Sequence, residues 1–121
     1  MARSGSGAVF SRVRGCLVAT PLGDFDAAGA ERFRADLSAR LQHERFAGVV
    51  LDVSALEVMD AHDFAWVRGA LQVAALMGAS AMLAGLSPEV VAALVRLDVD
   101  LSGVAAELTV DRAVEALERA A

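Results

Sequence analysis

Three side chains that can do acid–base or metal chemistry stand within four residues: Asp60, His62 and Asp63. An imidazole flanked by two carboxylates can relay protons, and the same three groups can ligate a divalent metal. A metal site would need further His, Cys or acidic ligands, yet the other histidine, His43, lies in the polar segment LQHERF. A small α/β enzyme or metal-binding protein that uses Asp60, His62 and Asp63 is therefore the alternative interpretation.

The same residues fit the start of a helix. An aspartate at the residue before a helix accepts hydrogen bonds from the free amides of the first turn, and Asp60 precedes a helical stretch that runs from about Ala61 to Met77 and stops at Gly78. Asp63 then falls in that first turn. Because these roles need no catalysis, the sequence predicts a helix start, with no catalytic residue, no metal and no cofactor.

The elements around this point alternate in type. The runs GVVLDV (48–53) and SAMLAG (80–85) are typical of buried strands, and Ser87-Pro88-Glu89 is typical of a helix start. The remaining predicted elements are two strands or one bent strand in AVFSRV and CLVAT, a helix from Ala27 capped by Asp24 or Asp26, a short strand in 104–108 and a helix opened by Thr109 and Asp111. This order predicts an α/β domain with a largely parallel sheet.

Composition narrows the class of protein. The 121 residues suffice for one domain, predicted over 8–121 after a flexible tail at 1–7. The net charge of −5 argues against nucleic-acid and anionic-membrane partners. No apolar run reaches the roughly 18 residues that span a bilayer, and the single cysteine, Cys16, fits a reducing compartment. We expect a cytoplasmic protein.

The helix predicted at 61–77 has two apolar stripes. Phe64, Val67 and Leu71 lie on the first, and Trp66, Val73 and Met77 lie on or beside the second, while Arg68 and Gln72 are predicted to face water. A helix resting on a sheet needs one stripe only. The second is buried by neighbouring elements, or it is a protein–protein contact through which copies of the chain associate.

Three motifs in this order resemble the STAS domain family, which includes anti-sigma factor antagonists and the cytoplasmic domains of sulfate transporters. They are Asp52-Val53-Ser54, then Asp60 at the helix start, then Gly85-Leu86-Ser87-Pro88. The resemblance runs from about Ala8 to Leu117 and is strongest to the stressosome scaffold subunit. It implies a mixed, mostly parallel β-sheet with about four α-helices largely on one side.

The resemblance also implies a function in binding, without enzymatic activity. Members of the family bind switch-type serine/threonine kinases or anti-sigma factors, and STAS-domain sensor co-subunits, and we expect this chain to form a homo-oligomer as well. The matching positions predict a partner-docking site, made of Asp52, Ser54, Asp60, His62, Asp63, Gly85 and Ser87.

One position departs from the family pattern. In many members a Ser or Thr follows the aspartate at the helix start and is phosphorylated by the partner kinase, which releases the partner. Here the equivalent residue is Ala61, followed by His62, and Ala84 stands where relatives often have Thr. The chain is therefore predicted to act as a constitutively unphosphorylated form.

Overall fold

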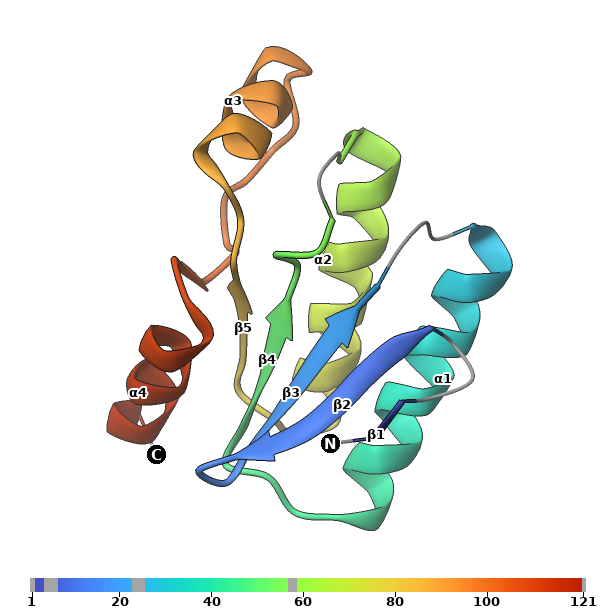
Figure 1. Ribbon diagram of the computed structural model, residues 1–121, viewed down its shortest axis with the longest axis vertical. Coiled ribbons are helices and arrows are strands. Elements are labelled where there is room, and N and C mark those ends of the chain that lie inside the picture. The colour runs from blue at the N-terminus through green and yellow to red at the C-terminus, as the bar shows by residue number, and fades with distance from the viewer. Residues whose placement is uncertain (1, 4–6, 23–25, 57–58, 121) are drawn as a thin grey trace.

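The computed structural model describes residues 2–3, 7–22, 26–56 and 59–120. Within them, six strands form one sheet in the order in which they occur along the chain, β1-β2-β3-β4-β5-β6 (Figure 1). The elements are β1 (Ala2–Arg3), β2 (Ala8–Val13), β3 (Cys16–Pro21), α1 (Ala27–His43), β4 (Gly48–Asp52), α2 (Ala61–Leu76), β5 (Ala81–Ala84), α3 (Pro88–Arg96), β6 (Ala106–Glu107) and α4 (Val110–Ala120).

The sheet is mixed and mostly parallel in its centre, as predicted. β1, β2 and β3 pair antiparallel, whereas β3, β4, β5 and β6 pair parallel. β2 and β3 form a hairpin through Arg14 and Gly15, which both have positive φ (48° and 82°), the backbone that a two-residue hairpin loop requires. The N-terminal Ala2 pairs with Phe10 of β2. The flexible tail at residues 1–7 and the domain boundary at residue 8 stay predictions.

Alternation along β4 divides the core into two layers. Val49 and Leu51 point into the larger cluster, under α1 and α2, while Val50 points into the smaller cluster, under α4. Val90 and Leu94 of α3 also join the larger cluster. The prediction of about four helices largely on one side is thus confirmed, with α4 as the helix that covers the opposite face.

α1 and α2 lie side by side and run in the same direction, because each one connects two parallel strands (Figure 1). The starts of both helices therefore lie at the end of the sheet where the parallel strands reach their carboxyl termini. This end carries the residues that the sequence singled out.

The predicted caps hold the helix starts. Asp26 accepts a hydrogen bond from the Gly29 amide at 2.7 Å, whereas the alternative cap, Asp24, lies outside the described residues. Ser87 caps α3 and Thr109 caps α4 in the same way, each at 3.2 Å. Among the helices of the described residues, none is long and apolar enough to cross a membrane.

Candidate functional site

The start of α2 is fixed by a reciprocal pair of hydrogen bonds between Asp60 and Asp63. The Asp60 carboxylate accepts from the Asp63 amide at 2.8 Å, and the Asp63 carboxylate accepts from the Asp60 amide at 3.1 Å. This capping box satisfies two amides that would otherwise have no partner in the helix. Both carboxylates that the sequence offered for chemistry are therefore engaged in holding the helix start.

The electrostatics of Asp60 agree with a structural role. The hydrogen bond from the Asp63 amide lowers the pKa of the Asp60 carboxyl, and the nearby His62 lowers it further. A carboxyl that works as a general acid near neutral pH needs the opposite shift. Asp60 is therefore a carboxylate at neutral pH, suited to accept hydrogen bonds.

The geometry around His62 is open. His62 is exposed, and within the residues that the structure describes no group of three or more His, Cys, Asp or Glu side chains is placed to hold a metal. His62 and Trp66 instead line a cleft of about 250 Å³ between the starts of α1 and α2. The α1 wall of this cleft carries both signs of charge, from Asp26, Glu31 and Arg34.

These contacts separate the roles of Asp60 and His62. We expect Asp60→Ala to lower the melting temperature by about 3–6 °C, because it removes a helix cap, and His62→Ala to change it by less than about 2 °C. Thermal unfolding, with and without a chelator, measures both effects. A melting temperature that the chelator lowers in the wild type but not in His62→Ala would establish a metal site instead.

The Asp60 effect should also depend on pH. Because the folded-state pKa of Asp60 is lowered, its contribution to stability is present above the unfolded-state value of about 3.9 and is lost as the pH falls through the folded-state pKa. The difference in melting temperature between the wild type and Asp60→Ala is therefore expected to shrink below about pH 4. A difference that stayed constant to pH 2 would contradict this assignment.

A second cluster lies where β4 and β5 end. Asp52 pairs with Ala84 across the two strands, and its carboxylate accepts from the Ser54 amide at 3.0 Å. Gly85 has a φ of +80°, and a Cβ at this position would lie 2.8 Å from the Asp52 Oδ1 atom and 3.0 Å from the Ser54 nitrogen. The backbone thus requires glycine here, for both its conformation and its close contacts.

The predicted docking residues fall into these two groups. Asp52, Ser54 and Gly85 touch one another, and Ser87 follows them as the cap of α3. Asp60, His62 and Asp63 lie in the first turn of α2 and its cap. Both groups lie at the same end of the sheet, beyond the carboxyl termini of the parallel strands (Figure 1). That they form one docking site stays a prediction.

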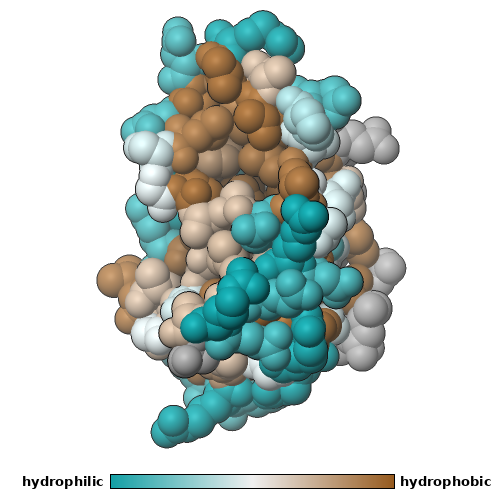
Figure 2. Space-filling view, turned by 90° about the vertical axis from the view of Figure 1, so that its left-hand side faces the viewer, coloured by the Kyte–Doolittle hydropathy of each residue, from teal (hydrophilic) through white to brown (hydrophobic). Residues whose placement is uncertain are grey.

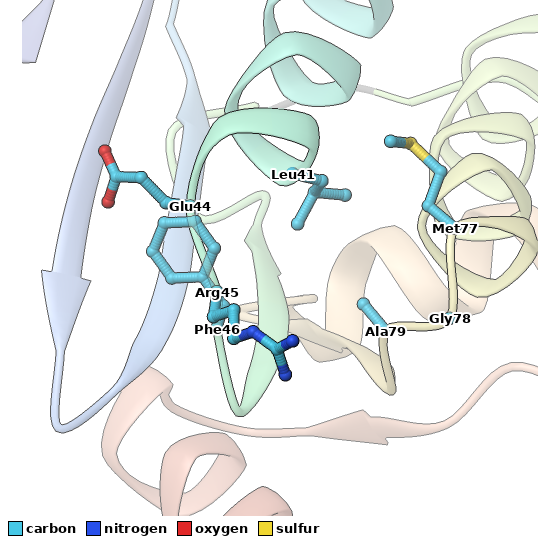
Figure 3. Close-up of a pocket in the computed structure, with 7 residues that line it drawn as sticks. All are labelled: Leu41, Glu44, Arg45, Phe46, Met77, Gly78 and Ala79. Carbon is cyan, nitrogen blue, oxygen red and sulfur yellow. The ribbon is translucent and has the colours of Figure 1, made fainter.

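The second apolar stripe of α2 is partly covered by α1. Trp66 is half-buried and meets the ring of Phe33 edge to face, with the ring centres 5.7 Å apart. Met77, at the other end of the helix, lines a pocket of about 240 Å³ together with Leu41 and Phe46, and its side chain points toward Leu41 (Figure 3). Val73 is half-buried as well. Self-association through Trp66, Val73 and Met77 stays a prediction.

Arg68 was predicted to face water, and the structure corrects this. Its guanidinium donates to the backbone carbonyls of Asp100 and Ser102 in the loop after α3 and lies over the ring of Phe64. In the same loop, hydrogen bonds from Ser102 lower the pKa of Asp100, with the larger effect from the Ser102 side chain and the smaller from its amide. No local pattern in the sequence signals this contact, because its partners lie more than thirty residues away.

Comparison with known proteins identifies one family. The family model of the STAS domain matches residues 8–115, whereas no match was found among curated proteins. A serine-to-glutamate variant of RsbS from Moorella thermoacetica is similar at 25% identity, with a TM-score of 0.78 over 93% of this chain and 96% of that one.

Two further structures share the fold. One, from a study of the molecular architecture of the stressosome, has 24% identity and a TM-score of 0.80 over 93% of this chain and 97% of that one. The other is the anti-sigma factor antagonist SpoIIAA of Bacillus in its unphosphorylated form, with 19% identity and a TM-score of 0.63 over 93% and 96%. With its sheet, its helices and its motif order, the chain belongs to the STAS domain family, is similar to RsbS and shares its fold with the anti-sigma factor antagonist SpoIIAA.

Proposed function

We propose that this chain is a non-enzymatic binding module of a partner-switching pathway, acting as an anti-sigma factor antagonist or as a stressosome scaffold. Its partners are a switch-type serine/threonine kinase or an anti-sigma factor, with STAS-domain sensor proteins as co-subunits, in the cytoplasm. The observation that carries this proposal is Ala61. It is exposed, it is the first residue of α2, and it directly follows the capping residue Asp60.

The docking site consists of Asp52, Ser54, Asp60, His62, Asp63, Gly85 and Ser87. Its backbone is held before any partner arrives, by the capping box of α2, by the turn that Asp52 closes onto Ser54, and by the cap of α3. A preformed surface loses little conformational entropy on binding. The neighbouring cleft between His62 and Trp66 offers a concave place for one side chain of a partner.

The side chain at position 61 is a methyl group, which cannot be phosphorylated. Ala61 has no oxygen to accept a phosphoryl group, so a kinase has no acceptor at this position. SpoIIAA, by contrast, has been solved in both its unphosphorylated and its phosphorylated forms. Since a phosphate adds nearly two negative charges and three acceptor oxygens, its absence keeps this chain in the form that binds.

A charge at position 61 tests the proposal. We expect the wild type to bind a switch kinase or anti-sigma factor from its native host, and Ala61→Glu to bind about tenfold more weakly or worse, because a carboxylate then faces the partner. Ala35→Glu is the matched control, since Ala35 is an exposed alanine in the middle of α1. Isothermal titration calorimetry measures all three. Equal affinities for the wild type and Ala61→Glu would place the docking site elsewhere.

A further inference from the structure

The exposed side of α3 carries apolar as well as charged side chains. Val90 and Leu94 face the core, but Val95 is 59% exposed, and Leu97, directly after the helix, is 54% exposed. Leu108, before α4, is 63% exposed. Figure 2 shows apolar side chains gathered over the α3 end of this face, whereas the α4 end is mostly hydrophilic. Contiguous apolar surface of this kind marks interaction sites.

Two pairs of residues flank the exposed side of this helix. Val91 and Val95 are one turn apart along one flank, and Glu89 and Arg96 are two turns apart along the other. Ala92 is exposed between the two flanks. In the part of the chain that the structure describes, neither Glu89 nor Arg96 has an ion-pair partner.

The midpoints of the two pairs lie within one residue of each other: Ala93 is midway between Val91 and Val95, and the midpoint of Glu89 and Arg96 falls between Ala92 and Ala93. If a second α3 packs antiparallel with a twofold axis at Ala92 and Ala93, each flank meets the same flank of the other copy with its order reversed. Glu89 then faces Arg96 of the second copy, twice over, and Val91 meets Val95. The small side chain of Ala92 lies at the crossing, where it lets the two backbones approach closely. In this arrangement the charges of the two helices are complementary and their apolar flanks face each other.

We propose that α3 is the contact of a homodimer in which the two copies of the helix pack antiparallel across a twofold axis at Ala92 and Ala93. The inference rests on the self-association included in the proposed function, and it assigns that association to α3 in place of the α2 stripe of Trp66, Val73 and Met77. A parallel twofold pair would set the charged flank of each copy against the valine flank of the other, so the pairing of opposite charges and of apolar side chains selects the antiparallel arrangement.

Two charge reversals test this geometry. Glu89→Arg makes the charged flank wholly basic, and Arg96→Glu makes it wholly acidic, so each variant replaces two attractions with two repulsions. We expect the wild type to dimerise in sedimentation velocity and each variant alone to dimerise at least tenfold more weakly. An equimolar mixture of the two variants, and the double variant Glu89→Arg/Arg96→Glu, should dimerise like the wild type. Circular dichroism confirms that each variant is folded.

Three outcomes overturn the proposal. They are a wild type that stays monomeric at millimolar concentration, reversal variants that dimerise as the wild type does, and a mixture that fails to recover the dimer. Leu76→Glu is the matched control, because Leu76 is an exposed leucine, 87% accessible, beside Met77 on α2. Loss of the dimer in Leu76→Glu, with dimers retained in the reversal variants, would assign self-association to α2. The docking function is tested separately by measuring whether Arg96→Glu binds the kinase. Loss of the dimer is expected to leave that binding unchanged.

Discussion

Replacing Ala61 with serine is expected to turn a chain that a switch kinase leaves unmodified into one that it phosphorylates, up to one phosphate per chain. The backbone at this position is already held by the capping box of Asp60 and Asp63, and residue 61 is exposed. The substitution adds the missing oxygen nucleophile at the point where the family pattern has a hydroxyl. Intact-mass spectrometry after incubation with the kinase and ATP counts the phosphates, and peptide mapping locates them.

The chain supplies its own control for this experiment. Ala27 is also an exposed first residue of a helix, and it also follows an aspartate cap, Asp26. Ala27→Ser is expected to remain unmodified, because the proposed docking site surrounds the start of α2. A kinase that binds Ala61→Ser yet transfers no phosphate would show that the geometry of the site differs from that of the family. Equal phosphorylation of Ala27→Ser would show that the kinase reads only the local sequence.

Gly85→Ala is expected to destabilise the fold by about 2–4 kcal/mol. One part of this loss is the left-handed backbone at φ +80°, which L side chains rarely adopt. The other part is steric, because the new methyl group would lie 2.8 Å from the Asp52 Oδ1 atom and from the Ser54 Cβ atom, and 3.0 Å from the Ser54 nitrogen. The Asp52 Oδ1 atom is held by a hydrogen bond from the Ser54 amide, so moving it away from the new methyl group would break that bond, and the Ser54 nitrogen can move only with the backbone. Chemical denaturation measures the free energy of unfolding.

Gly78→Ala separates the two parts. Gly78 has almost the same φ, +85°, but nothing lies within 4 Å of the position of its Cβ. Its loss should therefore be confined to the backbone cost of about 1–2 kcal/mol. The excess loss in Gly85→Ala then measures how tightly the turn after β4 is pressed against the end of β5. Equal losses in the two variants would mean that Asp52 and Ser54 move aside without cost.

Local patterns were enough to predict most of the elements. The apolar runs of β4 and β5, the Ser87-Pro88 start of α3 and the Asp60 cap of α2 each depend on residues close together in sequence, and each is confirmed. Local patterns do not predict which face of the sheet a helix covers. The buried stripe of α4, which includes Val114 and Leu117, is clear from its spacing, but nothing in that spacing says that it lies opposite α1 and α2.

The site was predictable in the same partial way. The sequence located Asp60, Ala61 and Gly85, but it did not show that Gly85 presses against Ser54, since that contact joins segments thirty residues apart. For the same reason the sequence left open whether the stripe of Trp66 is buried within the chain or contacts another protein, and it did not show that Phe33 partly covers Trp66 or that Arg68 binds the loop after α3. Contacts between distant segments depend on how the elements pack, which a helical pattern does not specify.

The shared direction of α1 and α2 has an electrical consequence. The aligned peptide dipoles of a helix leave about half a positive charge at its N-terminus. With both helices starting at the same end of the sheet, two such N-termini lie side by side there, in a chain whose net charge is −5. The carboxylates of Asp26, Asp60 and Asp63 already accept hydrogen bonds from the amides at these two helix starts. A phosphate on a hydroxyl at position 61 would meet both the dipole charge and the repulsion of these neighbouring carboxylates. The two helix dipoles thus offset part of the negative charge that the capping aspartates bring to this end of the sheet.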